Sequence, residues 1–146
     1  MKKTILMLTG LFLLGISTAR ADHDKAVSIA QLPRVAQQFI QEYFAMEKVA
    51  YAKKERDFFE VKYEVIFTSG KKVEFYRNGD WKDVDCRYAT VPAGIVPAPI
   101  MAKARELYGD VAVLEIDRDK RNYEVKLTNG LELTFDLRYN LLVIDD

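Results

Sequence analysis

The sequence predicts an α+β fold made of two tandem repeats, each a helix followed by an antiparallel meander of strands. Apolar residues recur at helical spacing within residues 33–44 and 97–108. Stretches in which apolar and polar residues alternate follow each of these segments. The second half of the chain also matches the first half when Tyr63 is aligned with Tyr123.

The N-terminal segment has the pattern of a signal peptide. Residues 1–3 carry positive charge, residues 5–16 form an uncharged apolar run, and Ala19-Arg20-Ala21 matches the small-x-small site of signal peptidase. The run is shorter than the ~20 residues that span a bilayer as a helix. We therefore expect cleavage before Asp22, which leaves residues 22–146 as one domain, periplasmic or secreted, with no membrane span.

Composition excludes several classes of protein. The chain has 146 residues, 49% hydrophobic and 30% charged, which is typical of a globular protein. Its 22 basic residues balance 22 acidic ones, and loss of Lys2, Lys3 and Arg20 with the signal peptide leaves 19 basic residues. Such a mildly acidic chain lacks the basic field of a nucleic-acid-binding protein, so no nucleic acid is expected.

The internal match defines two predicted repeats, at about residues 31–86 and 95–146. Residues 63–70 read Tyr-Glu-Val-Ile-Phe-Thr-Ser-Gly, and residues 123–130 read Tyr-Glu-Val-Lys-Leu-Thr-Asn-Gly. The segment between the repeats, residues 90–99, holds three of the four prolines and is typical of a stiff connector.

Each predicted helix carries an apolar stripe and a suitable end. Pro33 fits the first turn of the first helix, and Gly109 provides a stop for the second. Stripes of this kind usually face a core. Their members are Val35, Ala36, Phe39, Ile40, Tyr43 and Phe44 in the first helix, and Ile100, Ala104, Leu107 and Tyr108 in the second.

The turns fix the predicted strand register. A three-residue loop at residues 68–70, with its glycine left-handed, places Val65 opposite Val73, Tyr63 opposite Phe75 and Glu64 opposite Glu74. The corresponding loop at residues 128–130 places Val125 opposite Leu133. Further strands are expected at residues 49–52 and 111–116, and after a turn at Asn78-Gly79.

The order of these motifs resembles a known family. Leu32-Pro33 before the helix, the Tyr-Glu-Val-x-Phe/Leu-Thr-x-Gly motifs, and Asn-Gly-Asp-Trp-Lys-x-Val-Asp at residues 78–85 are similar to the β-lactamase-inhibitor-like, PepSY-like domains, small exported proteins of Bacteroides-type bacteria. The resemblance covers residues 32–145. It implies helices packed on one face of an antiparallel sheet and no established catalytic activity. β-Lactamase inhibitory protein itself grips an enzyme with the concave face of a joined sheet.

The cysteine count separates this chain from that inhibitor. Its repeats are cross-linked by disulfides, whereas Cys86 is the only cysteine here and can form no intrachain disulfide. This departure argues against β-lactamase inhibition. We interpret Cys86 as a buried thiol at a strand end, with an intermolecular disulfide or a reactive thiol as alternatives.

Residues with catalytic or metal-binding potential are sparse. The only histidine, His23, follows the predicted cleavage site and cannot complete a nucleophilic triad. Asp117-x-Asp119 lacks the turn glycine and bidentate acid of a calcium loop. The pairs Asp83/Asp85 and Asp145/Asp146 are interpreted as solvated acids at strand ends. We therefore expect no enzyme activity, no cofactor and no metal.

The polar face of the predicted sheet is the candidate binding surface. It carries Lys62, Glu64, Glu74, Tyr76, Glu124, Lys126, Glu132 and Thr134. Mixed charges on one sheet face often only meet water. The like charges of Glu64 and Glu74 oppose strand pairing, so these two residues and Tyr76 are the binding candidates. Phe58 and Tyr76 near its edge are possible aromatic anchors.

Three functions follow from these observations. The leading hypothesis is an exported, non-catalytic module that binds an envelope or secreted protein or peptide through its sheet face. A structural accessory of a cell-envelope assembly is the alternative, and a small hydrolase is a third.

Overall fold

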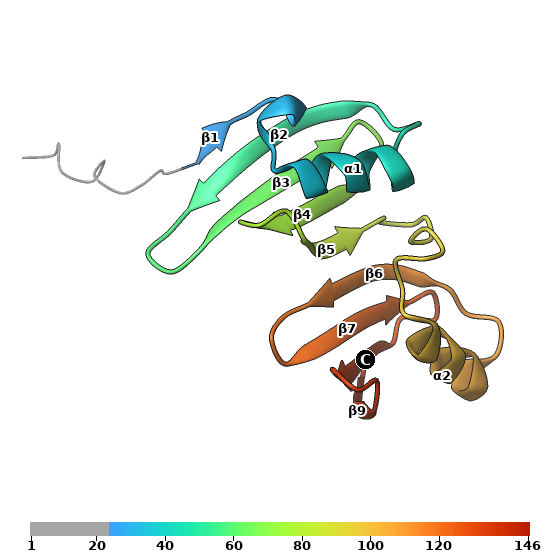
Figure 1. The fold of residues 1–146 in the computed structure, drawn as a ribbon. Helices are drawn as coiled ribbons and strands as arrows, with labels where there is room; N and C mark the ends of the chain where they lie inside the picture. Colours follow the sequence, from blue (N-terminus) through green and yellow to red (C-terminus); the bar gives the residue numbers. More distant parts are fainter. Residues whose placement is uncertain (1–23) are drawn as a thin grey trace, which may run out of the picture.

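A single antiparallel sheet of nine strands dominates the computed structural model, which describes residues 24–146 (Figure 1). The strands lie in the sheet in the order in which they occur along the chain. The strands are β1 (Lys25–Ala26), β2 (Val49–Arg56), β3 (Val61–Phe67), β4 (Lys72–Tyr76), β5 (Trp81–Asp85), β6 (Val113–Arg118), β7 (Asn122–Leu127), β8 (Glu132–Asp136) and β9 (Leu141–Asp145). The helices are a 3-10 turn at Ile29–Gln31, α1 (Arg34–Tyr43) and α2 (Ala98–Tyr108).

The predicted fold class is wrong. We expected an α+β protein of two helix-plus-meander repeats, whereas the described chain is mostly one continuous sheet with only two α-helices. Hydrogen bonding continues from β5 to β6, where Val84 lies opposite Ile116. Two separate meanders would each expose an unpaired strand edge over a thin core. Pairing β5 with β6 removes both of those edges.

The predicted register within the hairpins is confirmed. Tyr63 lies opposite Phe75 and Glu64 opposite Glu74, and Val125 lies opposite Leu133. The loop after β3 has the expected form, because the Gly70 N–H donates to the Phe67 carbonyl over 2.9 Å and Gly70 has a φ of 91°. This conformation is easily reached only by glycine.

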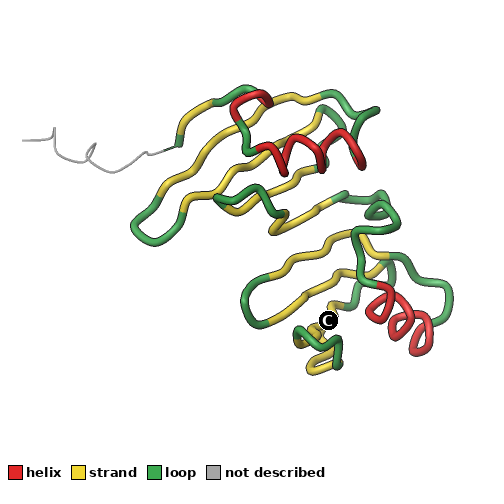
Figure 2. The backbone as a smooth tube through the Cα atoms, in the orientation of Figure 1, coloured by secondary structure: helices red, strands yellow, loops and turns green. Residues whose placement is uncertain are grey.

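One face of the sheet supplies the core, and both helices pack against it (Figure 2). Phe75 and Phe135 are fully buried, and Ala36 of α1 and Ala104 of α2 belong to the same buried cluster. Cys86, just after β5, is also buried, which confirms the structural interpretation of this thiol. Burial raises the pKa of Cys86 to about 11.

The predicted signal peptide and His23 lie outside the described residues. No helix within residues 24–146 is long and apolar enough to cross a membrane.

Candidate binding face

The face of the sheet opposite the helices carries a line of carboxylates. Glu64 on β3 lies opposite Glu74 on β4, and Glu74 in turn lies opposite Asp83 on β5. The line continues across the β5–β6 junction, where Asp83 lies opposite Asp117, and ends at Glu124 on β7. We call these five residues the acidic row. Directly opposed side chains have Cβ atoms about 5 Å apart, so each carboxylate has an acidic neighbour.

Lysines compensate only one end of the acidic row. Lys53 Nζ lies 3.7 Å from Glu64 Oε2, and the Nζ atoms of Lys62 and Lys72 lie 3.9 and 4.0 Å from Glu74 Oε1. Among residues 24–146, the ion pairs that involve the row reach only these two glutamates. Asp83, Asp117 and Glu124 have no ion pair among these residues, and we call them the uncompensated part of the row.

Asp83, at the centre of the row, is the most perturbed acid. Its Oδ1 atom is buried and has no hydrogen-bond partner among the described residues. Burial raises the pKa of Asp83 to about 8, and the carboxylates of Glu115, Asp117 and Glu74 also raise it. A carboxyl group in this setting favours its neutral form because its charge is both desolvated and repelled.

The neighbouring acids are perturbed in the same direction. Burial is the main cause that raises the pKa of Asp117, with Lys82 opposing it. Burial, followed by the Glu132 carboxylate, raises the pKa of Glu124. Burial also raises the pKa of Glu64, and Lys53 opposes the rise. The folded protein therefore holds several carboxylates at a cost in free energy.

A shallow cavity lies beside the uncompensated part of the row. Its volume is about 140 Å³, and Glu115 and Lys126 face one another across β6 and β7 at its wall. Lys126 Nζ lies 3.8 Å from Glu115 Oε2. The lining residues are Glu115, Asp117, Glu124, Lys126 and Glu132.

The three predicted binding residues lie in two different settings in the structure. Glu64 and Glu74 lie together in the acidic row, although Glu64 is only 8% exposed. Tyr76 lies at the end of β4, and its hydroxyl donates to the Arg118 carbonyl over 2.6 Å. That hydroxyl therefore already serves to join β4 to β6. Whether any of the three contacts a partner stays a prediction.

The sequence pattern did not reveal the central residues of the row. Asp83 was paired with Asp85, and Asp117 with Asp119, because these acids are close along a strand. The residues that matter together are Asp83 and Asp117, on different strands. Alternation along β5 and β6 indicates that both acids can share the polar face, but only the pairing of these strands makes them neighbours.

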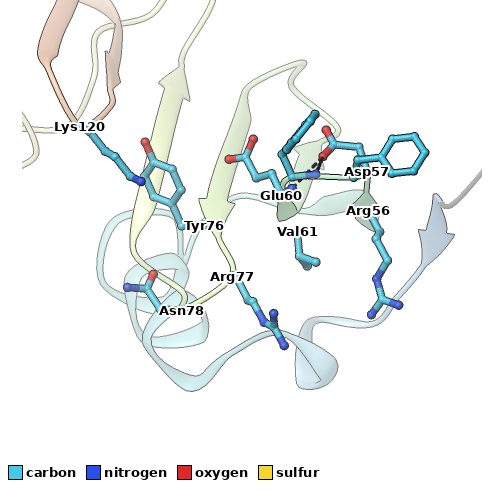
Figure 3. Close-up of a pocket in the computed structure, with 10 residues that line it drawn as sticks. Arg56, Asp57, Glu60, Val61, Tyr76, Arg77, Asn78 and Lys120 are labelled. Carbon is cyan, nitrogen blue, oxygen red and sulfur yellow. Dashed lines mark hydrogen bonds between the residues drawn. The ribbon is translucent and has the colours of Figure 1, made fainter.

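A larger cavity opens at the end of the sheet, where the β2–β3 hairpin approaches the β4–β5 turn (Figure 3). Its volume is about 890 Å³. Figure 3 shows the side chains of Arg56 and Arg77 on the same side of this cavity, and Lys120 reaching toward the Tyr76 ring. The lining residues are Arg56, Asp57, Phe58, Phe59, Glu60, Val61, Tyr76, Arg77, Asn78 and Lys120.

Within residues 24–146, one continuous antiparallel sheet with helices on one face and polar residues on the other is the architecture of a small open-faced sheet protein. The family described as "Putative beta-lactamase-inhibitor-like, PepSY-like" matches residues 19–62 and 61–143. The chain belongs to this PepSY-like family, as its motifs predicted. Among the curated proteins compared, none matches this chain.

Solved structures of Bacteroides proteins are similar in both sequence and fold. A "putative calcium-regulated periplasmic protein" of Bacteroides thetaiotaomicron is 51% identical, with a TM-score of 0.83 over 87% of this chain and 100% of that one. A "putative periplasmic protein" of Bacteroides vulgatus is 46% identical, with a TM-score of 0.84 over 87% and 100%.

A further Bacteroides vulgatus structure, a "putative periplasmic protein of unknown function", is 33% identical to this chain, with a TM-score of 0.80. It is matched over 84% of this chain and 99% of its own. These relatives are all periplasmic proteins, and the chain is a periplasmic protein, which confirms the prediction of a periplasmic or secreted location.

Proposed function

We propose that this protein is a non-catalytic periplasmic binding module whose open sheet face holds a basic segment of a protein or peptide. The observation that carries the proposal is the acidic row, in which five carboxylates stand in consecutive register on β3 to β7. The basic segment supplies cations to Asp83, Asp117 and Glu124, which have no ion-pair partner within residues 24–146.

The energetics of the row support a ligand. Directly opposed like charges destabilise a strand pair by up to about 1 kcal/mol. A lysine directly opposite an acid avoids this cost, as Lys126 does opposite Glu115. Perturbed titratable groups that share one surface are also typical of functional sites. The inhibitor-like description of the family further favours a protein as the partner.

The residues also favour binding over catalysis. Residues 24–146 contain no histidine, and the buried Cys86 thiol has a raised pKa, so it is a poor nucleophile near neutral pH. The acidic row provides charge but no nucleophile with an adjacent base. A hydrolase therefore has little support from this site.

Calcium is not part of the proposal. The Bacteroides thetaiotaomicron relative is described as calcium-regulated, and the acidic row is the feature here with the matching charge. Within residues 24–146, however, no group of three or more acidic, histidine or cysteine side chains is placed to hold a metal ion. The carboxylates stand side by side along the sheet and do not converge on one point.

The test compares binding of lysine- and arginine-rich peptides to the protein and to an Asp83→Asn/Asp117→Asn variant. These isosteric changes keep the side-chain shape but remove the negative charge of Asp117 and the carboxyl group of Asp83, which a bound cation would help to ionise. We expect affinity to fall at least ~10-fold, the equivalent of about 1.4 kcal/mol. The Asp110→Asn variant is the control, since Asp110 is exposed and lies in the loop after α2.

A second variant, Glu64→Lys, places a lysine at the compensated end of the row. It should weaken capture of the peptide and also lower stability, because the new lysine would lie opposite Lys53 in a position that is only 8% exposed. Unchanged affinity and salt dependence in both variants would remove the acidic face as the binding surface. Co-fractionation with envelope complexes, without peptide binding, would instead support a structural accessory.

A further inference from the structure

The tip of the β2–β3 hairpin exposes two adjacent aromatic side chains. Phe58 is 99% exposed and Phe59 is 97% exposed, and their ring centroids lie 6.4 Å apart. Neither ring belongs to the core or to the residues packed against it. A pair of fully exposed phenylalanines is costly in water and is typical of a contact surface.

The turn itself does not require these aromatic residues. Asp57 Oδ1 accepts hydrogen bonds from the N–H groups of Phe59 and Glu60 over 2.9 and 2.8 Å. The Asp57 N–H also donates to the Glu60 carbonyl over 3.0 Å. The aspartate thus holds the turn through the backbone, as in an Asx-turn.

The β6–β7 hairpin provides a comparison within the same molecule. Asp119 Oδ1 accepts from the N–H groups of Arg121 and Asn122 over 2.7 and 2.9 Å. The Asp119 N–H donates to the Asn122 carbonyl over 3.0 Å. This turn has the same hydrogen bonds, yet Lys120 and Arg121 stand where the first hairpin has its phenylalanines. Folding of the turn therefore does not require particular side chains at these two positions.

Three cationic side chains line the same cavity as the two phenylalanines. Arg56 and Arg77 extend on one side of the 890 Å³ cavity behind the tip, and Lys120 approaches from the neighbouring hairpin (Figure 3). The acids in the lining are Asp57, which already holds the turn, and Glu60. The tips of both hairpins point toward the same end of the sheet (Figure 1).

We propose that the β2–β3 tip docks this protein on an anionic phospholipid surface. Phe58 and Phe59 enter the interfacial layer of the bilayer, while Arg56, Arg77 and Lys120 contact lipid phosphates. This proposal uses residues outside the acidic row and stands apart from the proposed peptide binding.

The exposure and charge of the tip favour a bilayer over a protein partner. Both rings lie at a hairpin end and are almost completely exposed, although they also line the 890 Å³ cavity. Interfacial binding depends on inserted apolar area together with attraction between basic residues and anionic lipids. The tip combines both features, and a periplasmic protein meets membrane surfaces in its own compartment.

The test is co-sedimentation of the exported chain with vesicles of phosphatidylcholine, alone or mixed with phosphatidylglycerol. We expect binding to the mixed vesicles and little to phosphatidylcholine alone. The Phe58→Ser/Phe59→Ser variant should reduce the partition coefficient at least ~10-fold, because two aromatic rings no longer insert. Arg56→Gln/Arg77→Gln should weaken the preference for phosphatidylglycerol, with Lys120 left to contact the lipid phosphates.

The control is Tyr88→Ser, since Tyr88 is an aromatic residue of similar exposure, 98%, in the loop after β5. It should bind vesicles like the unmodified protein. The Phe58→Lys/Phe59→Arg variant carries the residues found at 120 and 121, and it should unfold at an unchanged temperature. The proposal is overturned if the protein fails to bind mixed vesicles, or if the serine variant binds equally well. If the unmodified protein does not bind vesicles, and the Phe58→Ser/Phe59→Ser variant loses binding to a protein, the tip is assigned to a protein partner.

Discussion

Replacing Asp83 by asparagine should stabilise the protein in alkaline solution and change little in acid. Asp83 lies in the middle of the acidic row, opposite Glu74 and Asp117, and its Oδ1 atom is buried without a hydrogen bond among the described residues. Asparagine keeps the shape of the protonated side chain and removes the charge. The substitution therefore isolates the cost of ionising this group.

The direction follows from the pKa of Asp83, which burial raises to about 8 in the folded protein. In the unfolded chain an aspartate loses its proton near pH ~4. Between these values the folded chain binds more protons, so its free energy of unfolding falls as the pH rises. The contribution is fully present below about pH 4 and is lost once the pH passes about 8.

The magnitude has an upper limit of about 6 kcal/mol, from about 1.4 kcal/mol for each pKa unit. Asp83 is partly exposed, and solvent screening reduces that limit to about 2–3 kcal/mol. Asp83→Asn should therefore raise the free energy of unfolding by about 2–3 kcal/mol near pH 9 and by less than about 0.5 kcal/mol near pH 4.

Urea unfolding across this pH range measures the effect, with Asp110→Asn as the exposed control. Because Asp117 and Glu124 also have raised pKa values, some pH dependence should remain in the Asp83→Asn variant. An equal effect of Asp83→Asn at both pH extremes, or destabilisation in alkaline solution, would refute the assignment of a repelled, desolvated carboxylate.

Three further predictions concern the core and one turn. Phe135→Ala should lower the free energy of unfolding by about 3–5 kcal/mol, since Phe135 is fully buried; a loss under about 1 kcal/mol in urea unfolding would contradict that placement. Gly79→Ala should cost at least about 1 kcal/mol more than Gly130→Ala, because both glycines have positive φ but only a Cβ at position 79 would lie 2.9 Å from Pro33 Cβ. Equal unfolding midpoints would mean that the β4–β5 turn does not pack closely on the start of α1. Cys86 should resist a thiol reagent near pH ~8 until the protein unfolds, since burial raises its pKa to about 11, and labelling of the native protein would disprove this.

Local signals in the sequence were sufficient to predict the strand register of the hairpins. The glycine-containing loop at residues 68–70 leaves few choices of register, and alternation then identifies the buried partners Tyr63 and Phe75. Gly109 likewise follows α2 directly and caps it. These features depend on residues close together in sequence, where backbone conformation and side-chain pattern agree.

The pairing of β5 with β6 could not be predicted in this way. Helix α2 and its connections separate the two strands in sequence. The backbone N–H and C=O groups at a strand edge are the same for every residue, so the side-chain pattern does not indicate which strand pairs there. Trp81, Val84 and Asp85 fit a strand that ends a sheet as well as one that continues it. The error in fold class and the failure to group Asp83 with Asp117 have this common origin.

Tyr76 illustrates a second limit. Its position beside Glu74 in the pattern made it a candidate for partner binding, yet its hydroxyl donates to the carbonyl of Arg118 on β6. The guanidinium of Arg118 lies 3.8 Å from the centre of the Trp81 ring, and its Nε donates to the Trp81 carbonyl. These contacts join β4 and β5 to β6, so their residues have a structural use that alternation cannot reveal.

The β5–β6 pairing also explains why the acidic row exists only in the complete sheet. Strands β3 to β5 alone provide Glu64, Glu74 and Asp83, whose first two members have lysine partners. Strands β6 and β7 alone provide Asp117 and Glu124. Joining the two groups brings Asp83 against Asp117 and creates the uncompensated part of the row. The same junction closes the core around Val84 and Ile116, both fully buried. Packing on the helical face thus offsets charge repulsion on the open face, and the candidate binding site arises where the two halves of the sheet meet.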